Sequence, residues 1–192
     1  MTLSRLLRSE DARQTLDLTL RLTQRSVSSE FKGTALGRLW SFINPLATVA
    51  VFSLIFGVVF RGGVAPGRNS GIDSFALWIG IGVLSWNFMS SGIMASMNAL
   101  VDNSGLLTKV YFPRQVLIYS AVLSLAVDFA FELLVLTVIA MIMGGPGVLL
   151  MLPALLVVTL LAGMFAVGLG LILSIATVYF RDLGHLWQIF NQ

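Results

Sequence analysis

The chain has 192 residues, of which 57% are hydrophobic and 11% are charged. Soluble globular domains have about 25% charged residues, so this composition excludes an ordinary soluble fold and indicates an integral membrane protein. The chain has no cysteine, which excludes disulfide bonds, thiolate metal sites and cysteine nucleophiles.

The first 38 residues are polar and contain no apolar core of signal-peptide length, so we expect them to be kept in the mature protein. Leu16, Leu20 and Val27 fall in one helical stripe, whereas the leucines at 16, 18, 20 and 22 alternate as in a strand. A lone strand beside a membrane would leave its edges unpaired. We therefore predict an interfacial helix within residues 10–32.

Four apolar stretches follow, at residues 39–60, 75–97, 115–143 and 148–180. Each reaches the roughly 20 residues that a membrane-crossing helix needs, and lipid tolerates no unpaired backbone groups, so the stretches must be helical. The alternating segments of about ten residues that mark a membrane barrel are absent. The sequence thus predicts an all-α integral membrane protein with a cytoplasmic segment (1–38) and a transmembrane domain (39–192). Gly33 and Gly37 should bracket the turn between them.

Lys and Arg are distributed unevenly around these stretches. Seven precede the first span, Lys109 and Arg114 lie in the loop at 98–114, and Arg181 follows the fourth span, whereas only Arg61 and Arg68 lie on the other side. Since cytoplasmic flanks carry the excess of positive charge, we place the N-terminus and the 98–114 loop in the cytoplasm. The net charge of +3 reflects this asymmetry and not an affinity for nucleic acid.

The fourth stretch has 33 uncharged residues, more than one perpendicular crossing needs, so part of it must tilt, kink or lie flat. Pro153 is placed to begin its helix. Gly163, Gly168 and Gly170 favour close helix packing over a hinge.

Asp128 and Glu132 are the only charged residues deep inside a predicted span, and their i, i+4 spacing places them on one helix face. An Asp at the bilayer centre costs about 2.5–3.5 kcal/mol on insertion scales, so both side chains must face protein or water. One interpretation is the ion site of a secondary transporter, which is the alternative function. We favour a hydrogen-bonded pair at a helix contact or along a polar conduit, since no Lys or Arg lies at comparable depth.

His185 is the only histidine, and the sequence has no HExxH motif, nucleophile triad or Gly-rich phosphate loop. We therefore expect no catalytic site, no metal site and no resident cofactor. If the protein uses ATP, another chain must bind it.

Aromatic residues are numerous. Phe52, Phe56 and Phe60 repeat every four residues along one helix face and either pack against neighbouring helices or line a passage in which sugar faces stack. Four further aromatic residues are candidate anchors at the membrane interface, on the basis of residue type and position: Trp40, Phe42, Trp86 and Trp187.

The loop at 98–114 is short and amphipathic. Lys109 and Arg114 suit an anchor at the headgroups, but that role does not explain Leu106, Leu107 and the aromatic pair Tyr111-Phe112. We interpret the loop as a docking surface for a cytoplasmic partner.

Five pieces of the chain, taken in order and spacing, resemble the permease subunit of type-2 ABC exporters of polysaccharides, the O-antigen, capsule and teichoic acid exporters. They are FKGTALGRLW at 31–40, NP at 44–45, GIGVLSWNF at 80–88, LLTKVYFPR at 106–114 and VYFRDL at 178–183.

The resemblance implies a half-channel of six helices in the bacterial cytoplasmic membrane, working as a homodimer with two copies of an ATP-binding subunit that holds ATP and Mg²⁺. Contacts with that subunit would come from one residue before the first span and six in the loop: Lys32, Lys109, Val110, Tyr111, Phe112, Pro113 and Arg114. The polysaccharide would pass without any bond being changed. The family pattern continues past Arg181, so residues 183–192 are expected to begin a fifth helix and the chain to be part of a longer protein.

Overall fold

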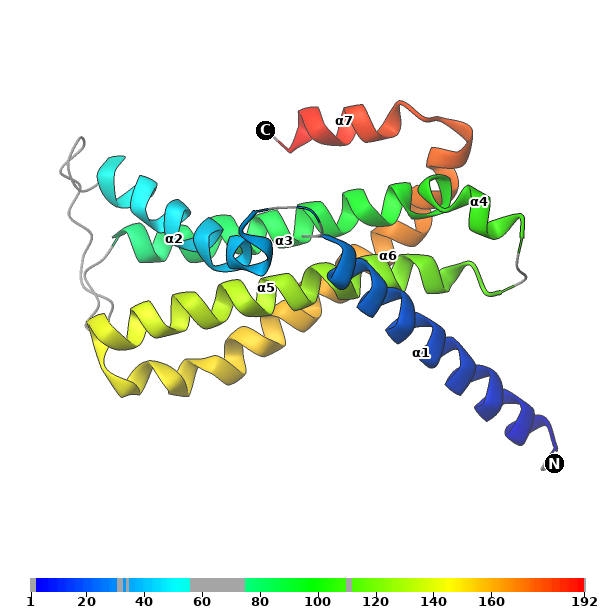
Figure 1. Cartoon of the computed structure of the whole chain (residues 1–192), viewed down its shortest axis with the longest axis horizontal. Coiled ribbons are helices and arrows are strands. Elements are labelled where there is room, and N and C mark those ends of the chain that lie inside the picture. The colour runs from blue at the N-terminus through cyan, green and yellow to red at the C-terminus, as the bar shows by residue number, and fades with distance from the viewer. Residues whose placement is uncertain (1–2, 31–32, 34, 56–74, 110–111, 192) are drawn as a thin grey trace. The chain divides into compact units, whose positions relative to one another are not determined.

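The computed structural model describes residues 3–30, 33, 35–55, 75–109 and 112–191, and this part of the chain contains helices and no strand. The helices are α1 (Leu3–Glu30), α2 (Trp40–Phe52), α3 (Phe75–Asp102), α4 (Ser104–Leu107), α5 (Gln115–Gly144), α6 (Leu152–Tyr179) and α7 (Leu183–Phe190) (Figure 1). Short 3₁₀ turns, Gly37–Leu39 and Pro146–Met151, precede α2 and α6. The predicted all-α fold is confirmed.

Three described helices, α3, α5 and α6, are long and apolar enough to cross a membrane. At 1.5 Å per residue the 30 residues of α5 extend about 45 Å, beyond the roughly 30 Å of a hydrocarbon core. The predicted first span is described only in part, as a shorter apolar helix over Trp40–Ile55. The chain is therefore a multi-pass membrane protein.

Two prolines mark helix starts, and that of Pro153 was predicted. Pro113 lies in the turn that leads into α5, where its carbonyl oxygen accepts a hydrogen bond from the Val116 N–H at 3.1 Å. Pro153 is the second residue of α6, a position whose N–H has no helical partner to lose. The 3₁₀ turn before α6 takes up residues 148–151 of the long fourth stretch, which accounts for part of its excess length.

The N-terminal segment forms a helix, which confirms that interpretation over the strand. Thr19 and Thr23 are buried. Burial leaves neither hydroxyl unsatisfied, because each donates a hydrogen bond to the carbonyl oxygen four residues earlier at 2.8 Å. Leu16 and Leu20, by contrast, are exposed. The threonine side of α1 faces the protein, and the predicted leucine stripe faces away from it.

The turn between α1 and α2 contains two glycines in the left-handed region, Gly33 with φ +87° and Gly37 with φ +53°. Side chains other than glycine are strained there. These positions confirm that the two glycines bracket the turn.

The chain divides into two units of contacting residues. The first comprises Met1–Glu30, Met89–Leu125 and Gly163–Gln192, and the second comprises Phe31–Phe88 and Ala126–Ala162. Each unit thus contains a part of α3, of α5 and of α6.

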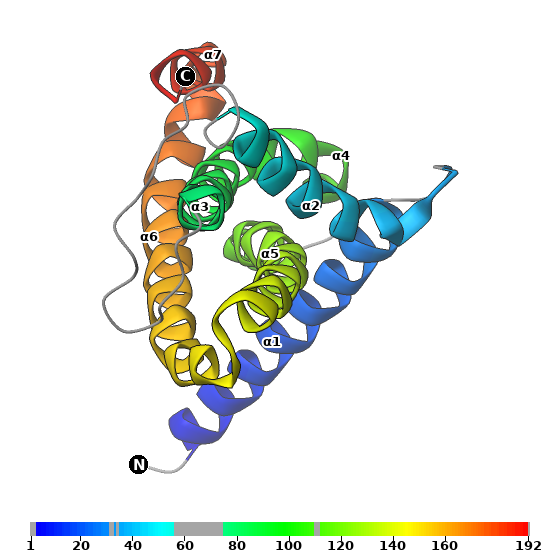
Figure 2. The same ribbon diagram turned by 90° about the vertical axis from the view of Figure 1, so that its left-hand side faces the viewer.

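Two buried clusters lie among the described residues of the first unit. One joins Ile93, Met97 and Ala166, and α7 adds Leu183 and Trp187 to it. The other is formed by the C-terminal end of α3 and the start of α5, and Leu22 of α1 packs against it. Figure 2 shows α1 beside α5, in agreement with this contact.

Trp187 was predicted as an interfacial anchor, but it is packed inside the first unit. Its indole N–H donates to the Ser90 carbonyl oxygen at 3.3 Å, and its ring lies against the cluster around Ile93. The sequence did not indicate this because α7 must first fold back against α3. Trp86, with 45% of its surface exposed, remains available as an anchor.

The second unit is held together by aromatic contacts between α2, α3 and α5. The rings of Phe88 and Phe129 stack with centroids 4.7 Å apart, and Phe42 meets Phe131 edge to face at 5.8 Å. Phe42 therefore packs between helices in the described structure, which differs from its predicted role as an interfacial anchor. The arrangement places one face of α2 next to the middle of α3 and α5.

Candidate functional site

A polar cavity lies among α2, α3 and α5 in the second unit. Its volume is about 530 Å³, and its polar lining consists of Asn44 and Thr48 from α2, Asn87 from α3 and Glu132 from α5. Phe52 completes the α2 side of the lining. The cavity therefore combines an aromatic ring with carboxamide, hydroxyl and carboxyl groups, all on helices of the membrane domain.

Helical periodicity explains the α2 side of this cavity. Asn44, Thr48 and Phe52 are four residues apart and so share one face of α2. Thr48 Oγ1 donates to the Asn44 carbonyl oxygen at 2.9 Å, which commits the only hydrogen of that hydroxyl. Towards a ligand, Thr48 therefore acts as an acceptor.

The other polar groups lie far from the ends of their helices. Asn87 and Glu132 are both at least twelve residues from either end of α3 and α5, which is about 18 Å along a helix axis. Among the described residues, no hydrogen bond or ion pair engages the side chains of Asn44, Asn87 or Glu132. They are thus free to bind a ligand that offers both donors and acceptors.

The two intramembrane acids, Asp128 and Glu132, have different surroundings in the structure. Glu132 lines the cavity, whereas Asp128, one turn earlier on α5, does not. Asp128 Oδ2 is buried and has no hydrogen-bond partner within the described structure. The predicted pair thus shares a helix but has two different environments.

One of the three predicted conduit aromatics lies within the described residues. Phe52 is in the cavity lining, and Phe56 and Phe60 lie outside the described residues. Asn44, Thr48 and Asn87 were not singled out as ligand-binding residues. Polar residues recurring at i and i+4 in an apolar helix, as Asn44 and Thr48 do, are the signal that identifies them.

The loop between α3 and α5 has an internal packing role. Leu106, Leu107 and Phe112 pack against the cluster of Ala99, Leu117 and Ile118. Their apolar character, which suggested a docking surface, is thus explained within the chain. α3 also continues to Asp102, so much of the predicted loop is helical.

The charged and polar residues of the loop face outward. Lys109, Pro113 and Arg114 are exposed, and no described residue forms an ion pair with Lys109 or Arg114. Lys32, Val110 and Tyr111 lie outside the described residues. Among the described loop residues, the two basic side chains are therefore open to a partner.

Residues 17–192 match the family model described as ABC-2 type transporter. The chain belongs to the ABC-2 type transporter family. This match covers nearly all of the chain, including α2, α3 and α5, which form the cavity. The resemblance found in the sequence is confirmed.

The chain is also similar to permeases of this family. It is 33% identical over 171 residues to the O-antigen export system permease protein RfbA of Myxococcus xanthus, a match that covers 88% of this chain and 62% of that protein. It is 25% identical over 167 residues to an O-antigen export system permease protein RfbA of Klebsiella pneumoniae, with coverage of 87% and 61%. The chain spans about three fifths of the length of these ABC-2 relatives.

Proposed function

We propose that this chain is the permease subunit of an ATP-driven transporter that exports polysaccharide, or lipid-linked polysaccharide, across the cytoplasmic membrane of a bacterium. The observation that carries the proposal is the match of residues 17–192 to the ABC-2 type transporter family. The relatives named as O-antigen export permeases support the class of substrate.

The chemistry of the polar cavity fits such a substrate. A sugar presents vicinal hydroxyls, which both donate and accept, and an apolar ring face. Asn44 and Asn87 supply amide donors and carbonyl acceptors, Glu132 supplies a carboxyl group, and Phe52 supplies a face for stacking. The described residues of the lining include no Lys or Arg, so the binding is suited to neutral hydroxyl groups.

Transport requires that the cavity bind the polysaccharide strongly enough for the polymer to enter and weakly enough for it to leave. A few hydrogen bonds to uncharged hydroxyls, each contributing about 0.5–1.5 kcal/mol, meet this requirement. The polymer moves past these groups with its covalent bonds unchanged. The chain acts as a conduit and not as an enzyme, and no cofactor of its own takes part.

ATP and Mg²⁺ are bound in this proposal by a separate ATP-binding subunit. Two copies of that subunit serve a homodimer of the permease. The exposed basic side of the loop, with Lys109 and Arg114, contacts the ATP-binding subunit, and Lys32, Val110, Tyr111, Phe112 and Pro113 belong to the same contact region. The N-terminus and this loop lie on the cytoplasmic side.

The test is reconstitution of the permease with its ATP-binding subunit in vesicles. Transport of lipid-linked polysaccharide is expected to depend on ATP and to be independent of a proton gradient. Flux that follows the proton gradient and ignores ATP would contradict the proposal and favour an ion-coupled transporter.

Variants of the cavity test its role in transport. Asn87→Leu should lower the initial export rate about tenfold, because one carboxamide that binds the polymer is lost. Glu132→Gln keeps the shape and the hydrogen bonding of the side chain and should stay within about threefold of the wild type. Thr159→Val, a polar-to-apolar change on α6 outside the cavity lining, is the matched control. Complete loss in Glu132→Gln at normal protein level would mean that transport needs an ionised carboxylate.

A further inference from the structure

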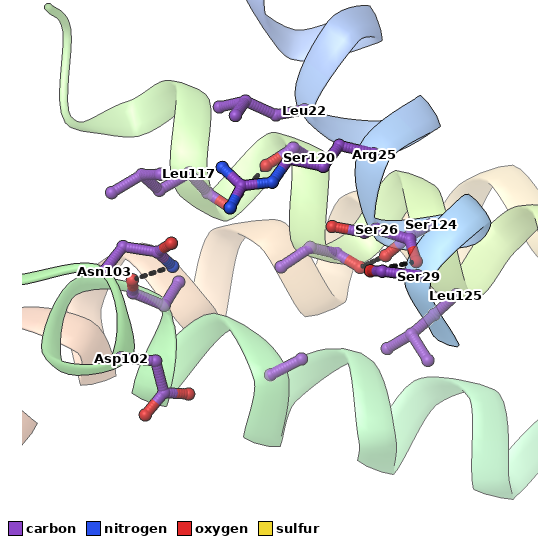
Figure 3. Close-up of a pocket in the computed structure, with 13 residues that line it drawn as sticks. Leu22, Arg25, Ser26, Ser29, Asp102, Asn103, Leu117, Ser120, Ser124 and Leu125 are labelled. Atoms are coloured by element: carbon purple, nitrogen blue, oxygen red, sulfur yellow. Dashed lines mark hydrogen bonds between the residues drawn. The ribbon is translucent and has the colours of Figure 1, made fainter. Parts of the chain in front are cut away.

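A second polar cavity lies in the first unit, between the later part of α1, the C-terminal end of α3 and the start of α5. Its volume is about 450 Å³, within the range of about 300–1,000 Å³ that is typical of small-molecule sites. Figure 3 shows Arg25 reaching from α1 towards α5 beside Ser120, with Asp102 and Asn103 at the end of α3.

The two charged residues of this cavity are unpaired. Arg25 and Asp102 are both exposed to the cavity opening, and neither forms an ion pair within the part of the chain that the structure describes. One cation and one anion therefore line the same space without neutralising each other. A ligand that carries both charges would complement them.

The hydroxyl groups narrow the choice of ligand. Ser29, Ser120 and Ser124 each donate their only hydrogen to a carbonyl oxygen of their own helix three residues earlier, at 2.9–3.0 Å. Their oxygens can then only accept further hydrogen bonds. The amide of Asn103 donates to the Ala99 carbonyl oxygen at 2.9 Å, which leaves its oxygen as another acceptor.

The cavity lining thus offers several acceptor oxygens, the Asp102 carboxylate and a strong donor group at Arg25. The cationic part of the ligand must be rich in N–H donors, as a primary ammonium with three hydrogens is. A quaternary ammonium has no N–H group and leaves these oxygens without partners. The anionic part must suit a guanidinium, as a phosphate does.

The location of the cavity matches a lipid headgroup. The segment between Asp102 and Gln115 connects two helices that are each long enough to cross a membrane, so the cavity opens at the membrane surface. The cavity extends along α5 to Leu125, about 15 Å from the start of that helix. Leu22, Ala95, Ala99 and Ala121 provide apolar walls for the glycerol and upper acyl region.

We propose that this cavity binds the zwitterionic headgroup of phosphatidylethanolamine, with the phosphate on Arg25 and the primary ammonium on Asp102 and the serine oxygens. The site is distinct from the cavity at Glu132, and the proposal does not depend on the exported substrate.

The test uses the purified full chain, stripped of lipid and titrated in detergent with phospholipids that share the same acyl chains. Native mass spectrometry then counts the lipids bound. Phosphatidylethanolamine should bind about fivefold more tightly than phosphatidylcholine, because about 1 kcal/mol is lost when the ammonium cannot donate a hydrogen bond, and it should bind more tightly than phosphatidylglycerol. Equal binding of phosphatidylethanolamine and phosphatidylcholine would overturn the proposal.

Two variants locate the site. Asp102→Asn should abolish the preference for the primary ammonium, and Arg25→Gln should weaken binding of all three phospholipids about fivefold. Asp182→Asn and Arg21→Gln change exposed residues of the same types outside the cavity lining and should leave binding unchanged. A preference that persists in Asp102→Asn would contradict the assignment.

Soluble phosphoethanolamine distinguishes a membrane ligand from a dissolved one. The lipid should bind at least tenfold more tightly than the soluble headgroup, because the apolar walls contact its glycerol and acyl region. Equal affinity of the two would assign the cavity to a soluble metabolite and overturn the lipid site.

Discussion

Gly170 shows how one residue sets the distance between two membrane helices. A Cβ atom at this position of α6 would overlap the Ser96 side chain of α3, and both Gly170 and Ser96 are buried. The Ser96 hydroxyl donates to the Gly92 carbonyl oxygen at 2.7 Å, so this polar side chain is satisfied inside its own helix. Small residues at helix contacts allow such an approach in membranes.

Gly170→Ala should therefore destabilise the chain by about 1–3 kcal/mol, the usual cost of forcing an extra group into a packed contact. Gly168→Ala is the matched control, since a Cβ atom there meets nothing within 4 Å. The measurement is the free energy of unfolding in mixed micelles of the two purified variants. Equal stability of both would show that α6 does not pack this closely against α3.

The sequence predicted glycine packing in α6 but did not distinguish Gly170 from Gly168. The two residues differ only in the side of the helix on which they lie, and the facing residue, Ser96, is on another helix. The same limit applies to the acids, since their i, i+4 spacing predicted a shared face. Only the position of α2 reveals that Glu132 lines a cavity and Asp128 does not.

At the scale of elements, α7 docks through Leu183 and Trp187, and Trp187 adds a hydrogen bond to its packing contact. Trp187 packs against the cluster of Ile93, Met97 and Ala166 and donates to the Ser90 carbonyl oxygen. Phe190, one turn later, has 77% of its surface exposed. The first of these aromatic residues therefore holds the helix, and the second does not.

Trp187→Ala should detach α7 at a cost of about 2 kcal/mol, below the 3–5 kcal/mol of a fully buried large-to-small change because the ring is only partly buried. Phe190→Ala is the control and should have little effect. Hydrogen exchange of the amides in Leu183–Phe190 measures the result. Unchanged exchange in Trp187→Ala would mean that other contacts hold α7.

Element types were predictable from apolar length, and element ends were less so. α5 begins at Gln115 as expected, because Pro113 fixes the preceding turn. α3 continues five residues past the predicted end of its span, to Asp102, since buried Ala99 belongs to a cluster that only the fold creates. Hydropathy therefore locates the membrane-spanning part of a helix but does not locate the residues at which the helix begins and ends.

At the scale of the whole molecule, the sequence predicted the family but did not show that three apolar loop residues pack within the chain. Order and spacing of five short motifs gave the resemblance that the family match confirms. Leu106, Leu107 and Phe112 pack within the chain, because the ends of α3 and α5 lie close together. That proximity is a property of the assembled helices, so the sequence alone does not separate these three residues from the exposed Lys109, Pro113 and Arg114.

Assembly with the ATP-binding subunit should then depend on charge. Lys109→Glu combined with Arg114→Glu reverses both exposed cations and should weaken association with that subunit about tenfold or more, since each lost ion pair at a rim contributes up to about 1 kcal/mol. Co-purification of the two subunits at increasing salt measures this effect, because exposed charge pairs are screened by salt.

The two single variants and a control variant distinguish a loss of docking at this loop from a general effect of the protein's changed net charge. Lys109→Glu and Arg114→Glu should each have a smaller effect than the pair, and Arg181→Glu, an exposed cation outside the loop, should have none. The internal cluster of Leu106, Leu107 and Phe112 is untouched by these changes, so the fold is preserved. Unchanged association of the double variant would refute a docking role for the basic side of this loop.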